Sequence, residues 1–259
     1  MFVAFGEIML RIAPEGHWRF RQCLPGKAEL SFAGAEANVC AALALWGAPC
    51  RYLTALPNNP IAESLLGVLR GLAIDTQYVV KRDDGRLGIY FVETGANQRS
   101  STVIYDREHS AISLALPNEY NFAAALDGSK WAHVSGITPA LSENAFVSTL
   151  ELVRLAKQHG LGVSCDLNFR NKLWRWKPGF SAKQLAHECM TQILPHVDLL
   201  IANEEDAGDV LGIHAEGASI EQGRLNPAAY EQVARAAVQQ FPNIARVAVT
   251  LRESVSASH

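Results

Sequence analysis

The sequence lacks several features that would assign it to other classes of protein. None of its five cysteines forms a Cys-x-x-Cys pair, which favours reduced thiols. Its 23 basic and 26 acidic side chains give a formal net charge of -3, so no basic field for nucleic acid or an anionic membrane is present. No apolar run is long enough to span a bilayer, and Glu7, Arg11 and Glu15 interrupt the N-terminus where a signal peptide would be apolar. These absences predict a soluble, cytoplasmic protein.

Several catalytic signatures are also absent. The 259 residues contain no HExxH, GxSxG, GxGxxG or GxxxxGK[ST] segment. These absences argue against a metalloprotease, an α/β-hydrolase, a dinucleotide-binding dehydrogenase and a P-loop enzyme. The histidines, among them His17, His109, His133 and His159, lack metal-ligand spacing and are interpreted as structural or surface residues.

Short apolar runs alternate with helical patterns along most of the chain. Strands are predicted at residues 2–5, 51–56, 131–137, 161–167, 197–202 and 246–251. Helices are predicted at 35–46, 61–69, 143–159, 184–194, 204–211 and 227–240. Strands separated by helices indicate parallel βαβ units, so we expect one domain over 1–259, a three-layer α/β/α sandwich with a mostly parallel sheet.

Two segments interrupt this alternation. Residues 18–32 lack a helical period, and residues 86–106 contain two strand-like runs joined by a turn at Gly95-Ala96-Asn97. Together they predict a small β-sheet, formed by about residues 12–33 and 86–110, that stands off the main domain as a lid. The exposed edges of such a sheet favour a homodimer that pairs through it.

Polar residues follow the predicted strands at the edge where an open α/β sheet binds ligands. Asp166, Asn168 and Arg170 alternate at strand spacing, so we expect their side chains to share a face. The alternative is an ion pair in which Asp166 merely holds Arg170. Asn203 and Asp206 open a short helix, where they fit either magnesium and nucleotide phosphates or ordinary helix capping.

Two further groups suit a small polar ligand. The small-residue run at 33–38 enters a helix and would let backbone approach a ligand, although helix-entry packing explains it equally. Tyr90, Tyr105 and Arg107 lie on the predicted lid, and the last two share a face. An aromatic ring and a guanidinium together would suit a polar organic acid. Ordinary cross-strand packing is the alternative.

Taken in order, these segments resemble ribokinase-like (PfkB) carbohydrate kinases, and within that family the 2-keto-3-deoxygluconate kinase branch. Residues 6–11 look like the opening strand, and 33–38 are similar to the Gly-Gly-x-x-x-Asn signature with Ala33 in place of the first glycine. Residues 166–170 match the D-x-N-x-R strand end. Residues 203–206 are similar to N-x-x-E with a final Asp, and 250–254 resemble the strand before the nucleotide loop.

The resemblance implies an activity and a set of site residues. The activity is ATP-dependent phosphorylation of the terminal hydroxyl of 2-keto-3-deoxygluconate to 2-keto-3-deoxy-6-phosphogluconate, with Mg²⁺. The implied substrate-binding residues are Gly34, Asn38, Tyr90, Tyr105, Arg107, Ile137 and Arg170, of which Arg170 is also catalytic. The implied ATP-binding residues are Asn203, Asp206 and Thr250, and Asp206 would also contact magnesium through water.

The catalytic base of that family is an Asp in a Gly-x-Gly-Asp motif downstream of the strand that ends near Thr250. The chain contains no such motif, so we expect it to be C-terminally truncated, with little or no turnover alone. Two other functions stay open. One is a noncatalytic protein that binds sugar acids, and the other is a kinase for another sugar or nucleoside, against which Tyr90, Arg107 and Arg170 argue.

Overall fold

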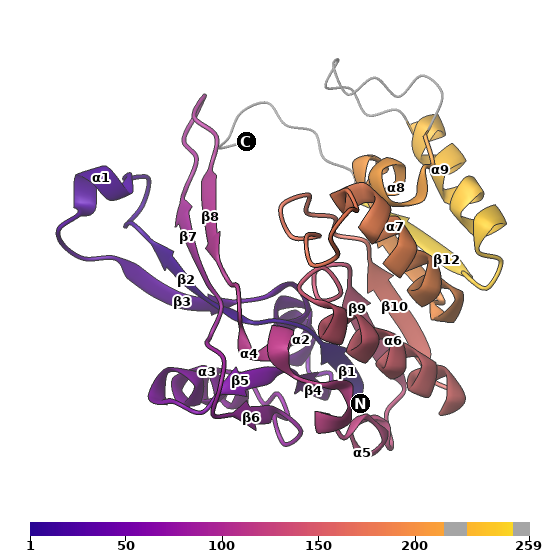
Figure 1. Cartoon of the computed structure of the whole chain (residues 1–259), viewed down its shortest axis with the longest axis horizontal. Helices are drawn as coiled ribbons and strands as arrows, with labels where there is room; N and C mark the ends of the chain where they lie inside the picture. The colour runs from indigo at the N-terminus through magenta and orange to yellow at the C-terminus, as the bar shows by residue number, and fades with distance from the viewer. Residues whose placement is uncertain (215–226, 251–259) are drawn as a thin grey trace.

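The computed structural model describes residues 1–214 and 227–250 (Figure 1). Its main sheet has six strands, and every neighbouring pair is parallel. In spatial order the strands are β12 (Arg246–Val249), β11 (Leu199–Ala202), β10 (Gly162–Asp166), β9 (Trp131–Ser135), β1 (Phe2–Phe5) and β4 (Cys50–Leu53). The parallel pairing confirms the α/β class, because each strand is followed by a segment that returns the chain to the same edge.

Helices pack on both faces of this sheet. On β1, Val3 and Phe5 belong to one core with helices α5 (Phe122–Leu126), α6 (Glu143–Gln158) and α7 (Ala182–Ile193). Ala4 points the other way, into a second core with α2 (Ala35–Leu45) and α3 (Pro60–Gly71). Because successive residues of a strand point to opposite faces, β1 is buried from both sides. The three-layer prediction is confirmed at this strand.

The remaining helices are short or lie at the end of the chain. They are α4 (Ala111–Leu114), α8 (Glu204–Leu211), α9 (Pro227–Gln240) and the 3₁₀ turns at Pro117–Glu119 and Leu194–His196. Within residues 1–214 and 227–250, no helix combines the length and apolarity that crossing a membrane requires.

Local capping explains where the long helices begin. Ser142 Oγ accepts a hydrogen bond from the Ala145 amide at 3.1 Å, so α6 starts at the next residue, as predicted. Helix α7 starts two residues earlier than predicted, because Ser181 Oγ caps it by accepting from the Gln184 amide.

The strand predicted at 51–56 is wrong, because the chain changes sheets inside it. Strand β4 ends at Leu53, and the following strand β5 (Ala55–Pro57) pairs in parallel with β6 (Val80–Arg82). Thr54 lies at the break, and its carbonyl accepts a hydrogen bond from the Val80 amide. The local sequence Arg-Tyr-Leu-Thr-Ala-Leu carries no signal for such a change of partner.

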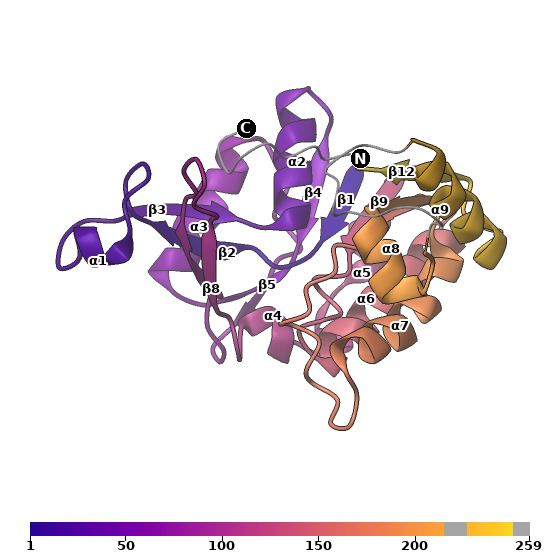
Figure 2. The same ribbon diagram turned by 90° about the horizontal axis from the view of Figure 1, so that it is seen from above.

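A second, four-stranded sheet stands beside the main one (Figures 1 and 2). Its order is β3 (Glu29–Ala33), β2 (Met9–Ala13), β7 (Ile89–Glu93) and β8 (Thr102–Asp106). Strand β2 runs parallel to β7 and antiparallel to β3, so the small sheet is mixed. Its first strand begins at Met9, before the predicted limit of about residue 12. Since only residues 6–8 separate β1 from β2, the small sheet joins the main sheet at its carboxyl edge.

Residues 18–32 contain one element that sequence reasoning missed. Helix α1 (Phe20–Cys23) is a single turn, too short to show a helical period. The Phe20 ring packs edge-on against Phe91 of β7 with centroids 5.8 Å apart, which holds this turn on the small sheet.

Trp174, in the segment after β10, is 1% exposed and belongs to the larger core. We expect Trp174→Ala to lower the free energy of unfolding by about 3–5 kcal/mol, because it leaves a cavity that the core cannot refill. Trp46→Ala is the matched control, since that side chain is 82% exposed, and it should change stability by about 0.5 kcal/mol or less. Urea unfolding measures both, and equal losses would contradict the packing described here.

Candidate functional site

A cavity of about 200 Å³ lies where the carboxyl edge of the main sheet meets the small sheet. The structure brings together all seven residues predicted for the substrate: Gly34, Asn38, Tyr90, Tyr105, Arg107, Ile137 and Arg170. The other lining residues are Glu7, Met9, Ala33, Ala35, Val103 and Asn168. These residues come from the two sheets, from the start of α2 and from the segments after β9 and β10.

The first wall is the start of α2, which approaches the end of β1 closely. A Cβ atom on Gly34 would lie 2.2 Å from the Glu7 carbonyl oxygen, so only glycine permits this approach. The helix begins at the next residue, and its N-terminus contributes partial positive charge to the cavity. Close helix packing, one of the two alternatives that the sequence left open, is therefore present at Gly34, which also lines the cavity.

The second wall consists of two tyrosines on the small sheet. Tyr90 and Tyr105 face each other in the β7–β8 register, with ring centroids 6.2 Å apart. Burial raises the pKa of Tyr90 and thereby favours its neutral phenol. As their spacing predicts, Tyr105 and Arg107 line the same cavity, and the guanidinium lies 5.6 Å from the Tyr105 ring centroid.

Arg107 is buried and already has a carboxylate partner. Its Nη2 donates to Glu7 Oε2, and the two residues are 7% and 3% exposed. Glu7 Oε1 and Arg107 Nε make no hydrogen bond, although both atoms are buried. Sequence reasoning noticed Glu7 as a strand end but missed this pairing. Part of the charge of Arg107 is therefore offset before any ligand arrives.

Arg170 is the more available cation. Its side chain is exposed, and it forms no ion pair with any of the residues that the structure describes. Its Nη1 donates a hydrogen bond to the Phe169 carbonyl at 2.8 Å. A guanidinium left in this state offers several donors to carboxylate or phosphate oxygens.

The prediction that Asp166, Asn168 and Arg170 share a face is wrong. Strand β10 ends at Asp166, and Asn168 adopts a left-handed backbone with φ of 37°, which stops the strand alternation. The Asn168 amide donates to Asp166 Oδ1 at 3.2 Å and closes a local turn. Asn168 and Arg170 line the cavity and Asp166 does not. The alternative ion pair between Asp166 and Arg170 is also absent among the residues described.

Glu36 is a buried residue behind the cavity lining whose role sequence reasoning missed. It is 0% exposed, and its Oε1 accepts from Ser135 Oγ at 2.6 Å and Thr138 Oγ1 at 3.4 Å. Burial raises the pKa of this carboxyl to about 7. These hydrogen bonds tie the start of α2 to the segment after β9, where Ile137 lines the cavity. The available signal was an acidic residue inside the small-residue run at 33–38.

The residues predicted for ATP lie beyond the ends of β11 and β12. Asn203 Oδ1 accepts from the Asp206 amide at 2.6 Å, so the helix-capping interpretation of Asn203 is confirmed. Thr250 follows β12 and is exposed, and its amide donates to the Ala202 carbonyl. The rest of the predicted segment, residues 251–254, lies outside the described part of the chain.

Asp206 connects this region to the cavity. It is 7% exposed and accepts from the Phe169 amide at 3.2 Å. Burial raises its pKa to about 6, and the neighbouring charge of Arg170 acts in the opposite direction. No group of three side chains suited to a metal ion occurs in the described ranges. The Asp206 carboxyl is one oxygen donor of the kind that magnesium accepts beside water and phosphate oxygens.

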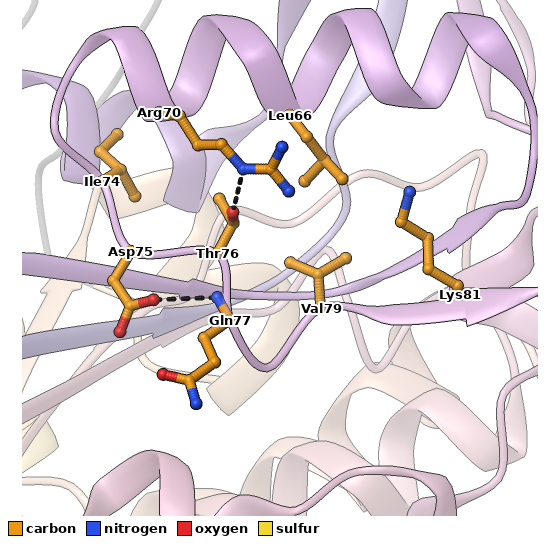
Figure 3. Close-up of a pocket in the computed structure, with 8 residues that line it drawn as sticks. All are labelled: Leu66, Arg70, Ile74, Asp75, Thr76, Gln77, Val79 and Lys81. Atoms are coloured by element: carbon orange, nitrogen blue, oxygen red, sulfur yellow. Dashed lines mark hydrogen bonds between the residues drawn. The ribbon is translucent and has the colours of Figure 1, made fainter.

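A cavity of about 470 Å³ lies elsewhere, between α3 and the segment leading to β6 (Figure 3). Its charged groups already have partners. Arg70 Nε donates to Thr76 Oγ1 at 3.0 Å, and Asp75 pairs with Arg51 at the edge strand β4. Lys81 pairs with Glu63. This cavity lies away from the carboxyl ends of the strands, and its charged lining residues are paired with other side chains. We therefore do not assign it as the main candidate site.

Comparison with known proteins agrees with the fold. A family model for pfkB family carbohydrate kinases matches residues 1–251, and the chain therefore belongs to that family. It is 34% identical over 218 residues to a 2-dehydro-3-deoxygalactonokinase of Haloferax volcanii, a match that covers 84% of this chain and 65% of that protein. The chain thus spans less than two thirds of that relative's length.

Solved structures show the same architecture. A 2-dehydro-3-deoxygluconokinase from Thermotoga maritima is 42% identical, with a TM-score of 0.90 over 99% of this chain and 73% of that one. The prefix 2-dehydro is equivalent to 2-keto. A Pyrococcus horikoshii sugar kinase in complex with ATP has a TM-score of 0.70 at 19% identity, covers 82% of this chain and 66% of that one, and shows the fold alone. The ribokinase-like fold is confirmed.

The Glu7–Arg107 pair predicts a strong coupling in a double-mutant cycle. Glu7→Gln or Arg107→Met alone leaves one buried charge uncompensated and should cost about 3–5 kcal/mol of unfolding free energy. The double variant should cost clearly less than the sum of the two single changes, by about 1 kcal/mol or more.

The exposed pair of Arg235 and Glu231, at 74% and 62% exposure, provides the control for this cycle. Its coupling energy should be about 0.5 kcal/mol or less. Urea unfolding measures both cycles, and additive losses for Glu7 and Arg107 would show that their contact contributes nothing.

The raised pKa of Glu36 predicts that the free energy of unfolding depends on pH. Its folded-state pKa is raised from 4.5 to about 7, so between these values the folded protein keeps a proton that the unfolded chain releases. Stability should therefore fall as pH rises through this window, by at most about 3 kcal/mol from this group. Glu36→Gln should flatten the profile between pH 5 and pH 7. Unfolding measured across that range, with the exposed Glu151→Gln as control, tests this, and an unchanged slope would count against it.

Proposed function

We propose that the chain provides the sugar-acid site of an ATP-dependent kinase that phosphorylates the terminal hydroxyl of 2-keto-3-deoxygluconate. The product would be 2-keto-3-deoxy-6-phosphogluconate. The observation that carries the proposal is the joint lining of one cavity by Tyr90, Tyr105, Arg107 and Arg170 at the carboxyl edge of the sheet. The 42% identity to the Thermotoga maritima 2-dehydro-3-deoxygluconokinase supports the same substrate.

The lining suits an acid better than a neutral sugar. Arg170 carries no carboxylate partner within the described residues, and a charge-assisted hydrogen bond to a substrate carboxylate contributes about 1.5–3 kcal/mol. The hydroxyls of Tyr90 and Tyr105 can donate to or accept from sugar hydroxyls. A nucleoside or neutral sugar has no anionic group with which to occupy Arg170.

Arg170 also lies between the sugar cavity and the predicted nucleotide region. It lines the cavity, and its charge partly offsets the rise that burial causes in the pKa of Asp206 at the start of α8. We therefore propose that Arg170 orients the acid and stabilises negative charge on the transferred phosphoryl group. When bound, ATP supplies that group and Mg²⁺ offsets its charge. Asn203, Asp206 and Thr250 are the residues proposed to face the nucleotide.

No residue of the chain is assigned as the acceptor of the hydroxyl proton, because the 259 residues contain no Gly-x-Gly-Asp motif. Turnover is expected when the chain is extended by a segment that carries this motif. An extended protein that binds the sugar acid but never hydrolyses ATP would favour the noncatalytic alternative.

We also propose that the small sheet covers the cavity as a lid, held in place by the Glu7–Arg107 pair, and pairs with a second copy of the chain. The exposed apolar side chains Trp18, Leu24, Leu30 and Ile104 support this pairing. Sedimentation of the protein tests it. Leu30→Glu should yield a monomer if this sheet forms the dimer interface.

A second candidate substrate is 2-keto-3-deoxygalactonate, the C4 epimer. The name of the Haloferax volcanii relative, a 2-dehydro-3-deoxygalactonokinase, favours it. Both acids present the same carboxylate to Arg170, so only contacts to the C4 hydroxyl would separate them.

Calorimetric titration with 2-keto-3-deoxygluconate, its C4 epimer, gluconate and ribose tests the substrate class. We expect the keto acids to bind and ribose not to bind. Arg170→Ala should weaken binding of the keto acids at least about tenfold, the loss of one charge-assisted contact. Arg154→Ala, an exposed arginine on α6, is the control and should leave binding unchanged. A well-folded protein that binds none of these acids would overturn the substrate assignment.

A further inference from the structure

The cavity of about 200 Å³ between the two sheets is called the substrate cavity below. A larger cavity of about 500 Å³ adjoins it along β8. Val103, Tyr105 and Arg107 line both cavities, so the edge strand of the small sheet forms their common wall. The opposite wall of the larger cavity comes from residues 172–176, in the segment after β10, and from Leu141. The reaction proposed above uses none of these opposite-wall residues.

The larger cavity carries positive charge that the protein leaves unneutralised. Lys172 and Arg175 line it and are exposed, and neither forms an ion pair or hydrogen bond with the residues that the structure describes. The neighbouring lysines behave differently, since Lys177 and Lys183 each pair with a carboxylate. The third cation of the lining, Arg107, is already offset by Glu7. The one acidic lining residue is Glu108, so the lining keeps an excess of positive charge.

The floor of the larger cavity is a fixed apolar surface. Trp176 lines it, donates from Nε1 to the Pro139 carbonyl at 3.0 Å and stacks on Phe146 with centroids 6.3 Å apart. Leu141 and Leu173 complete this surface. The buried Trp174 anchors the segment between the two cationic residues. A rigid aromatic and aliphatic floor beneath unpaired cations suits a ligand with a C–H face and an anionic group.

We propose that this cavity is a second binding site, separate from the substrate cavity, for an anionic carbohydrate that carries a carboxylate or a phosphate. Lys172 and Arg175 bind the anionic group, and Trp176 packs against the sugar. The choice of a carbohydrate rests on the proposed function, whereas the choice of an anion rests on the cations alone. A ligand here would contact Tyr105 and Arg107, which also line the substrate cavity, and so would alter substrate affinity.

The test measures binding of 6-phosphogluconate, the probe, to the Arg170→Ala protein. Removing Arg170 weakens binding of the anion in the substrate cavity, so that binding in the larger cavity can be measured. Calorimetry should detect one site for the probe in this protein. Adding Lys172→Ala and Arg175→Ala should weaken that binding at least about tenfold, the loss of one or more charge-assisted contacts. The matched control adds Lys130→Ala and Arg154→Ala, which remove the same charge at exposed positions outside both cavities, and should change binding less than threefold.

Two further arms identify the anionic group. Gluconate carries only the carboxylate and glucose 6-phosphate only the phosphate, so their relative affinities show which group Lys172 and Arg175 bind. Absence of probe binding in the Arg170→Ala protein would overturn the proposal, as would binding that the Lys172 and Arg175 changes leave intact. Failure of the proposed function has a different signature, since 2-keto-3-deoxygluconate would then not bind the unaltered protein.

Discussion

The buried ion pair between Glu7 and Arg107 determines how the two sheets stand relative to each other. Glu7 lies where the chain leaves β1, and Arg107 lies where it leaves β8, so one contact joins the main sheet to the small sheet. Lifting the small sheet would separate two charges that are almost fully buried, which is costly in an interior of low polarity. The same pair sets the charge of the cavity, because it offsets Arg107 and leaves Arg170 as the cation available to a ligand.

The turn after β10 serves both sides of the proposed reaction. Its left-handed residue, Asn168, redirects the chain so that Arg170 reaches the cavity between the two sheets. The next amide, that of Phe169, donates to Asp206 at the start of α8. The groups proposed to bind the sugar and to face the nucleotide are therefore held by adjacent peptide units. A displacement of this turn would disturb both together, which is useful where two substrates must be aligned for one transfer.

Much of the fold could be predicted because its signals are local. Helices α3, α6 and α7 each begin after a capping side chain, Asn59, Ser142 and Ser181, and the alternation of strands with helices indicates a parallel sheet. The predictions fail where the local structure depends on residues that are far away in the sequence. The change of sheet at Thr54 depends on pairing with Val80, and the left-handed Asn168 ends an apparent strand.

The residues of the site also divide into those with a local sequence signal and those whose contacts depend on distant partners. Its lining residues were predicted through a family resemblance that is itself carried by short motifs. The pairing of Glu7 with Arg107 spans 100 residues and has no local signature, and the same holds for the hydrogen bond from Ser135 to Glu36. Physical reasoning from sequence therefore found the polar groups that a ligand would meet. It did not find the buried groups that hold them in place.

The cavity takes its walls from residues 7 to 170, so it exists only when most of the chain is already in place. A partly folded molecule has no such cavity, and a ligand that fits it can bind only the completed fold. Binding of such a ligand therefore raises the free energy of unfolding, by an amount that grows with the logarithm of the ligand concentration. The resistance of the protein to proteolysis would then rise and fall with the concentration of the proposed sugar acid.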